Sequence, residues 1–159
     1  MKRFVLFASL LTIALIMSQR PVAAREDRNA TPAMALPKYD RVIAPYVAQA
    51  RATYPAAKKR YLAGLPRGHV FSLWMRLYQK DTAGKVVAAE DCFVAVERIA
   101  EGRVYGRLAN KPLIVSGYSL GDRVTGPESE IRNWMIVRPD GSEEGNVVGK
   151  YLERHYKLQ

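Results

Sequence analysis

Hydrophobic residues alternate with polar ones through residues 69–80, where every second position from Phe71 to Leu77 is apolar. This period of two is typical of a strand with one buried face. Trp74 and Tyr78 lie on the opposite face, so we expect that face to be partly covered as well. The chain therefore has a long strand near its middle.

The same alternation recurs in further segments separated by short turns. The predicted strands are residues 86–99, 104–108, 113–116 and 134–137, with a shorter alternating piece at 123–125. Turn residues rich in glycine, proline and aspartate separate them, and no helical period lies between residues 69 and 116. This arrangement predicts an antiparallel sheet of about five strands, a usual sheet size.

Helical spacing appears on either side of the strands. Apolar residues recur every three or four positions after Pro45, and Pro55 interrupts them, so we expect one helix from Pro45 to about Thr53 and a second over residues 56–63. Residues 147–157 carry a narrow apolar stripe and predict a short C-terminal helix. The fold class is α+β, with the N-terminal helices packed on the sheet.

Turn residues are densest between Gly117 and Tyr151. Pro127 begins a predicted helical turn that delivers Ile131 and Trp134 to the core, and residues 143–149 are expected to form a loop. Glycine tolerates the positive φ of tight turns, and proline presets φ before them. We interpret this stretch as scaffold, with structural roles for a set of motif residues: Gly121, Asp122, Trp134, Gly141, Gly145, Asn146 and Gly149.

The first 24 residues have a different pattern. A basic start precedes an apolar run of about 14 residues, and small residues end it at Ala24. This order predicts a signal peptide cleaved after Ala24, and the alternative is a retained membrane anchor, for which the run is short. Residues 25–38 predict a flexible arm, and residues 39–159 a single domain that is periplasmic or secreted and does not span a membrane.

The charge of the chain is strongly positive. The formal net charge is +10, and removal of residues 1–24 takes away three cations and no acid, which leaves +7. Such a balance favours anionic partners, while export argues against nucleic acid. The alternative is a soluble surface with an excess of lysine and arginine.

Several motifs resemble a known family. The stretch SGYSLGDRVTGPESEIRNWMIVRPDGSEEGNVVGKYL, the helix AQARATYPAAKKRYLAG and the hairpin pieces FVAVERI and GRLAN resemble the YegJ-type bacterial family, a domain of unknown function (number 2314). The resemblance covers residues 40–157. It implies a compact, often exported α+β domain with no established catalytic residue, and a neighbouring group with a similar ending looks like immunity proteins of toxin systems.

Candidate chemistry is sparse. His69 and His155, the two histidines, could hold a metal if they met Glu143 or Glu144, but their spacing gives no support for this. Cys92 could act as a nucleophile with a histidine, yet it follows Glu90 and Asp91, whose charge would raise the pKa of its thiol. We therefore expect a buried, inert thiol, no disulfide, no metal, no cofactor and no catalytic residue.

Basic and aromatic residues provide the remaining candidates for binding. The cations cluster on the second predicted helix, and exposed aromatics beside arginine often mark contact surfaces. The predicted binding residues are Arg51, Lys58, Lys59, Arg60, Tyr54 and Trp74. They favour a non-catalytic binding module of the cell envelope with an acidic protein or an anionic envelope component as partner. An immunity-like inhibitor of a toxin and a hydrolase of unknown type are the alternatives.

Overall fold

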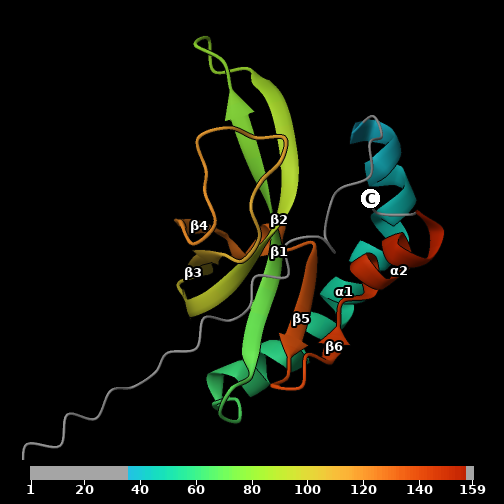
Figure 1. Cartoon of the computed structure of the whole chain (residues 1–159), viewed down its shortest axis with the longest axis vertical. Coiled ribbons are helices and arrows are strands. Elements are labelled where there is room, and N and C mark those ends of the chain that lie inside the picture. The colour runs from blue at the N-terminus through green and yellow to red at the C-terminus, as the bar shows by residue number, and fades with distance from the viewer. Residues whose placement is uncertain (1–35, 157–159) are drawn as a thin grey trace, which may run out of the picture.

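The computed structural model describes residues 36–156. The predicted signal peptide and residues 25–35 of the predicted arm lie outside this range. Figure 1 shows two helices beside one twisted sheet. The elements in chain order are α1 (Leu36–Leu62), β1 (Val70–Lys80), β2 (Val86–Ala100), β3 (Arg103–Leu108), β4 (Arg123–Pro127), the 3₁₀ turn η1 (Glu128–Glu130), β5 (Asn133–Val137), β6 (Glu143–Gly145) and α2 (Val147–His155).

The sheet is antiparallel, in the order β4-β3-β2-β1-β5-β6. The first four strands follow one another as a meander, and β5 returns to the free side of β1. The α+β prediction is confirmed, although the sheet has six strands and not about five. Residues 113–116 form no strand, because their backbone donors bond to the side chains of Glu90 and Gln79. Residues 143–145, predicted as loop, pair with β5.

Helix α1 is one continuous helix, so the predicted break at Pro55 is wrong, as is the predicted start at Pro45. Residues 36–38, expected in the arm, form its first turn. A proline inside a helix costs about 3 kcal/mol, but burial of one large apolar side chain contributes about 1.5–3 kcal/mol. The buried stripe of α1 outweighs both prolines, and its members are Tyr39, Ile43, Val47, Ala50, Tyr54 and Ala57.

The two halves of α1 contact opposite faces of the sheet. Asp40 bonds to Arg76 of β1, whereas the ring of Tyr54 stacks on Phe71 of the same strand. Phe71 and Arg76 are five positions apart, so their side chains point to opposite faces. The helix therefore passes the side of the sheet formed by β5 and β6, where α2 packs beside its first half (Figure 1).

Each face of the sheet has its own core. On one face the second half of α1 packs with Phe71, Leu73 and Trp134, and on the other its first half packs with Trp74 and Phe93. Both faces of β1 are thus covered, as the placement of Trp74 opposite the main apolar face predicts. Among residues 36–156, no helix combines the length and the apolar character that crossing a bilayer requires.

Candidate functional site

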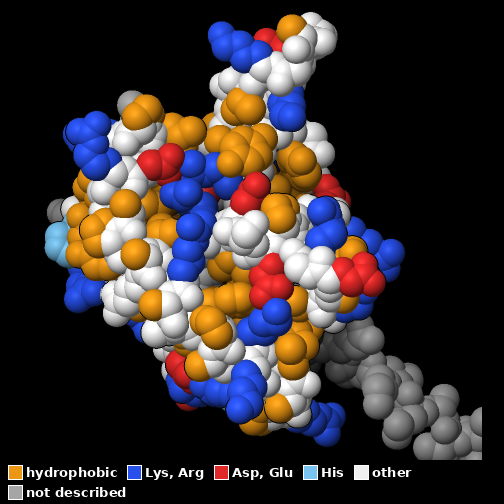
Figure 2. Space-filling model, turned by 180° about the vertical axis from the view of Figure 1, so that it is seen from behind, with side chains coloured by type: hydrophobic (Ala, Val, Ile, Leu, Met, Phe, Trp, Pro, Cys, Tyr) orange, Lys and Arg blue, Asp and Glu red, His pale blue; other side chains and the backbone are white. Residues whose placement is uncertain are grey.

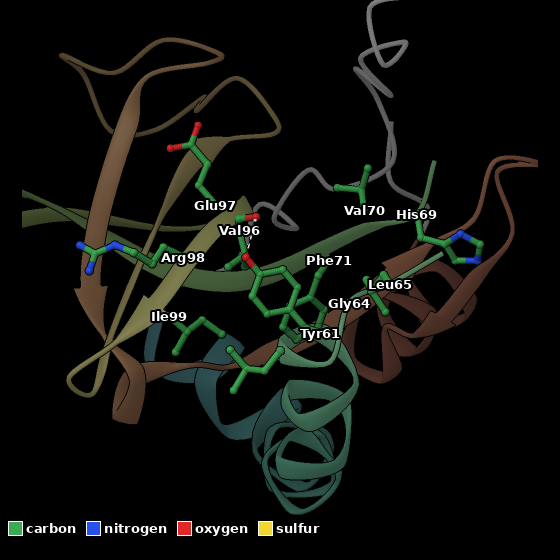
Figure 3. A pocket seen from close by; sticks show the side chains of 11 residues that line it. Tyr61, Gly64, Leu65, His69, Val70, Phe71, Val96, Glu97, Arg98 and Ile99 are labelled. Atoms are coloured by element: carbon green, nitrogen blue, oxygen red, sulfur yellow. Dashed lines mark hydrogen bonds between the residues drawn. The ribbon is translucent and has the colours of Figure 1, made fainter. Parts of the chain in front are cut away.

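A groove with a volume of about 580 Å³ lies between the end of α1, the start of β1 and the end of β2 (Figure 3). The sheet opens here because β1 leaves β2. Pairing of β1 with β2 extends only to Ser72 opposite Ala95, while Val70 and Phe71 pair with β5. Strand β2 continues alone beside β3 as far as Ala100. Its edge toward the groove is therefore not covered by β1.

The walls of the groove are largely apolar. The Tyr61 ring stacks on Phe71 with 5.1 Å between centroids, and its hydroxyl donates to the Val96 carbonyl over 3.4 Å (Figure 3). Burial, with the nearby Glu97 carboxylate, raises the pKa of Tyr61. Ile99 adds a half-buried side chain on the opposite wall. The arrangement can accept an extended segment with apolar side chains.

Charged groups at the rim are held by the protein itself. The Arg98 guanidinium lies 3.8 Å from the centroid of the Tyr105 ring, a cation–π contact. Glu97 accepts from Arg107 Nε over 2.8 Å. His69, also at the rim, points away from Tyr61 in Figure 3. The apolar walls and the edge of β2 are the remaining features of the groove.

The predicted basic cluster on α1 is largely engaged in contacts within the chain. Lys58 pairs with Glu128 at 2.5 Å, and Arg60 pairs with Glu144. Arg51 Nε donates to the Ile131 carbonyl over 2.8 Å. Arg51, Lys59 and Arg60 are exposed and Lys58 is half-buried, and Lys59 is the one of the four that has no ion pair or side-chain hydrogen bond within residues 36–156. The cluster fixes α1 to η1 and β6, which sequence reasoning missed because the acids lie about 70 or more positions away.

The two aromatics predicted for the binding surface are buried. Trp74 is 1% exposed and stacks on Phe93, with ring centroids 5.1 Å apart. Tyr54 packs against Phe71, and burial together with the Glu128 carboxylate raises its pKa. Neither side chain is available at the surface of the folded domain, because each is packed between α1 and the sheet.

A network of two arginines and two aspartates lies on the face of the sheet that carries Trp74. Arg76 Nε donates to Asp91 over 2.8 Å and its Nη atoms donate to Asp40 over 2.7 and 2.8 Å. Arg132 also donates to Asp40, over 2.6 Å. The hydrogen bonds from Arg76 hold the pKa of the Asp40 carboxyl below its usual range. The network joins α1, β1, β2 and the segment before β5.

This network was absent from the sequence prediction. The signal for it was an arginine and an aspartate inside two apolar strands that form a hairpin. Asp91 is fully buried, and loss of the partner of a buried charge costs about 3–5 kcal/mol. Since the four groups satisfy one another, we interpret the network as a clamp between elements.

The residues considered for metal binding or nucleophilic chemistry lie apart. No group of three or more histidine, cysteine or acidic residues within residues 36–156 could hold a metal ion. His155 lies on α2 with its Nδ1 2.9 Å from the Tyr151 carbonyl oxygen. Cys92 is buried, as predicted, and burial, with the charge of Glu90, raises the pKa of its thiol to about 12. A thiol so shifted is a poor nucleophile.

Comparison with known proteins adds one finding. The model of the family described as "uncharacterized protein conserved in bacteria", domain of unknown function 2314, matches residues 47–154. The chain belongs to this family. The resemblance noted from the motifs is thereby confirmed. Neither the curated proteins nor the solved structures contain a match to the chain.

The predicted scaffold residues near the carboxyl end form one cluster. Trp134 Nε1 donates to the Ala50 carbonyl over 3.1 Å, and its own carbonyl accepts from Asn146 N over 2.8 Å. Asn133 Nδ2 donates to Asn146 Oδ1 over 2.8 Å. A Cβ at Gly149 would lie 2.3 Å from that same Oδ1. The cluster connects β5, β6, α2 and α1.

The remaining motif residues lie in turns. Gly121 and Gly141 have positive φ values of 86° and 80°. The Asp122 carboxylate accepts from Ser119 N over 2.7 Å within the turn before β4. Both turns therefore have the backbone conformation that the glycines predict.

Proposed function

We propose that the chain is a non-catalytic binding module of the bacterial cell envelope, and that its groove takes an extended segment of a partner protein beside β2. The open edge of β2 carries this proposal. Strand addition to a sheet edge supplies main-chain hydrogen bonds, and neighbouring apolar walls supply selectivity. Here the edge runs directly past the walls formed by Tyr61, Phe71 and Ile99.

The envelope address rests on residues 1–24 and their predicted cleavage after Ala24. Sequencing of the amino terminus of the exported chain tests it, and we expect the first residue to be Arg25. An envelope-bound chain that still begins at Met1 would place the protein on a membrane anchor instead.

The binding proposal can be tested by affinity capture with variants. The chain from Arg25 onward is used to capture proteins from a periplasmic extract, beside Leu62→Asp and Ile99→Lys in the groove and Leu113→Asp outside it. Leu62 is 59% exposed, so its substitution should leave folding intact. We expect the wild type and Leu113→Asp to capture the same protein, and both groove variants to capture about tenfold less of it. A tenfold weaker affinity corresponds to about 1.4 kcal/mol.

Hydrogen exchange then locates the contact. Addition of the captured partner should slow exchange of the amides of residues 97–100 if a strand adds at this edge. Identical retention by all four chains, or unchanged exchange at these amides, would refute the proposal.

A further inference from the structure

Exposed apolar side chains are concentrated in one loop. The described residues have eight large hydrophobic side chains that are exposed, and four of them lie within residues 113–120. They are Leu113, Ile114, Tyr118 and Leu120. Leu113 is the most exposed of the eight, at 71%. Solvated loops rarely gather such residues, and their concentration points to a contact surface.

The end of the β1–β2 hairpin extends this surface. Ser116 N donates to Gln79 Oε1 over 3.1 Å, which fixes the loop to one face of the hairpin. Tyr78, the neighbour of Gln79, is exposed on the other face, as is Val87. Figure 2 shows hydrophobic side chains gathered below the projecting hairpin tip on the side turned away from the viewer in Figure 1. Apolar groups thus occur on both faces of this end of the molecule.

The backbone N–H groups at the start of the loop already have a hydrogen-bond acceptor within the protein. The buried carboxylate of Glu90 accepts from Leu113 N, Ile114 N and Val115 N over 2.7–3.2 Å. The backbone amides of Leu113 and Ile114 therefore have a hydrogen-bond partner inside the protein and do not depend on water. An unpaired backbone donor is costly in an apolar medium, and here that cost is already avoided.

Three lysines lie in the same two segments as the exposed apolar side chains. Lys80, Lys85 and Lys111 are exposed, and the structure shows no ion pair for them within residues 36–156. The nearby acids Asp81 and Asp122 accept backbone N–H groups of their own turns. Unpaired lysines beside apolar side chains are typical of surfaces that bind anionic lipid.

We propose that residues 109–122 and the end of the β1–β2 hairpin form a membrane-contact surface, which places Leu113 and Ile114 in the interfacial region of a bilayer containing anionic lipid. A fluid bilayer can surround apolar groups on both faces of a hairpin, whereas a folded partner with one flat surface covers a single face. The lysines supply charge complementarity to the headgroups. The inference concerns a surface and a partner separate from those of the groove.

Vesicle binding tests the inference without any protein partner. The chain from Arg25 onward, which lacks the apolar leader, is sedimented with sucrose-loaded vesicles of phosphatidylcholine alone or with roughly one third phosphatidylglycerol. We expect retention by the anionic vesicles that weakens as salt is raised, and about tenfold weaker binding for Leu113→Asp and Ile114→Asp. Lys111→Glu should weaken binding to the anionic vesicles alone.

Leu62→Asp is the matched control, since it places the same charge on an exposed leucine in the groove. It should bind vesicles like the wild type even if it loses a captured protein, so the two proposals fail separately. No retention of the wild type, or equal loss in Leu62→Asp, would overturn the membrane inference. So would a wild-type dimer in sedimentation equilibrium that Leu113→Asp abolishes, because the apolar surface would then cover a second copy.

Discussion

Two turn-rich segments of this domain differ in what they bury: one buries apolar side chains, and the other buries the hydrogen bonds of its backbone amides. Residues 131–149 turn their apolar side chains inward, and side-chain amides and the Trp134 indole satisfy one another or the backbone of α1. Residues 109–122 turn Leu113 and Ile114 outward, while their amides bond inward to Glu90. The same class of sequence, rich in glycine and proline, thus builds a buried scaffold in one place and an exposed apolar loop in another.

The difference teaches that turn residues fix the path of the chain but not the direction of its side chains. That direction follows from where the backbone finds its partners. In residues 131–149 a neighbouring strand and helix supply them, and at residues 113–115 a single buried carboxylate does. Four substitutions, ordered from the largest expected effect on stability to the smallest, test this contrast.

Trp134→Ala should cause the largest loss. Removal of a buried tryptophan typically costs about 3–5 kcal/mol, and Trp134 is 7% exposed. Chemical denaturation measures the loss of unfolding free energy. Trp134→Phe serves as the control, since it keeps an aromatic ring but removes the hydrogen bonds to Ala50 and Thr53, and it should lose less. A loss below about 1 kcal/mol for Trp134→Ala would contradict its role as scaffold.

Gly145→Ala should cause the next largest loss of unfolding free energy, about 3 kcal/mol. A Cβ there would lie 2.7 Å from the Trp134 carbonyl oxygen and 2.8 Å from its ring, and φ is 76°. Gly141→Ala is the matched control, because it has a φ of 80° with open space around it. The positive φ alone should cost about 1 kcal/mol. Equal losses in the two variants, measured by urea unfolding, would show that contact with Trp134 is unimportant.

Glu90→Gln should cost about 1–3 kcal/mol, because three backbone donors lose a charged acceptor. Amide exchange at residues 113–115 should accelerate, and hydrogen exchange with mass spectrometry measures it. Glu97→Gln is the control, since that carboxylate lies at the surface beside Arg107. If exchange at residues 113–115 is the same in both variants, the loop is held by contacts other than Glu90.

Leu113→Asp should change stability by less than about 0.5 kcal/mol, since the side chain contacts water. Val115→Asp, two positions away, should cost about 3 kcal/mol or more, because Val115 is buried in the core. Thermal unfolding compares the two. A large loss for Leu113→Asp would mean that the loop packs its leucine inward in solution.

Much of the fold could be predicted from local pattern. The alternation around Leu73 places one face of β1 in the core, and the glycines at 121 and 141 mark turns with positive φ. The candidate groove could not be predicted in this way. It arises where β1 separates from β2 before Ser72 while it stays paired with β5 on its other edge, and this pairing depends on contacts between segments far apart in the chain.

The basic cluster shows the same limit. The local sequence predicts that Arg60 is a free cation on a helix surface, but in the structure it pairs with Glu144, which is 84 positions away. The local sequence predicts that the helix ends at Pro55, but burial of the apolar stripe from Tyr39 to Ala57 stabilises the helix by more than the proline destabilises it. Local rules fail here because the compensating contacts are tertiary.

The sequence by itself determined the class of fold, the two faces of β1 and the turns, since these depend on side-chain period and on the backbone freedom of glycine and proline. Only the tertiary structure decided which carboxylate meets Arg76. A turn over residues 81–85 without irregularity would place Glu90 opposite Arg76, but a bulge between Gln79 and Lys80 shifts the register by one residue. Asp91 therefore joins the arginine network, and Glu90 turns to the other face and holds the apolar loop.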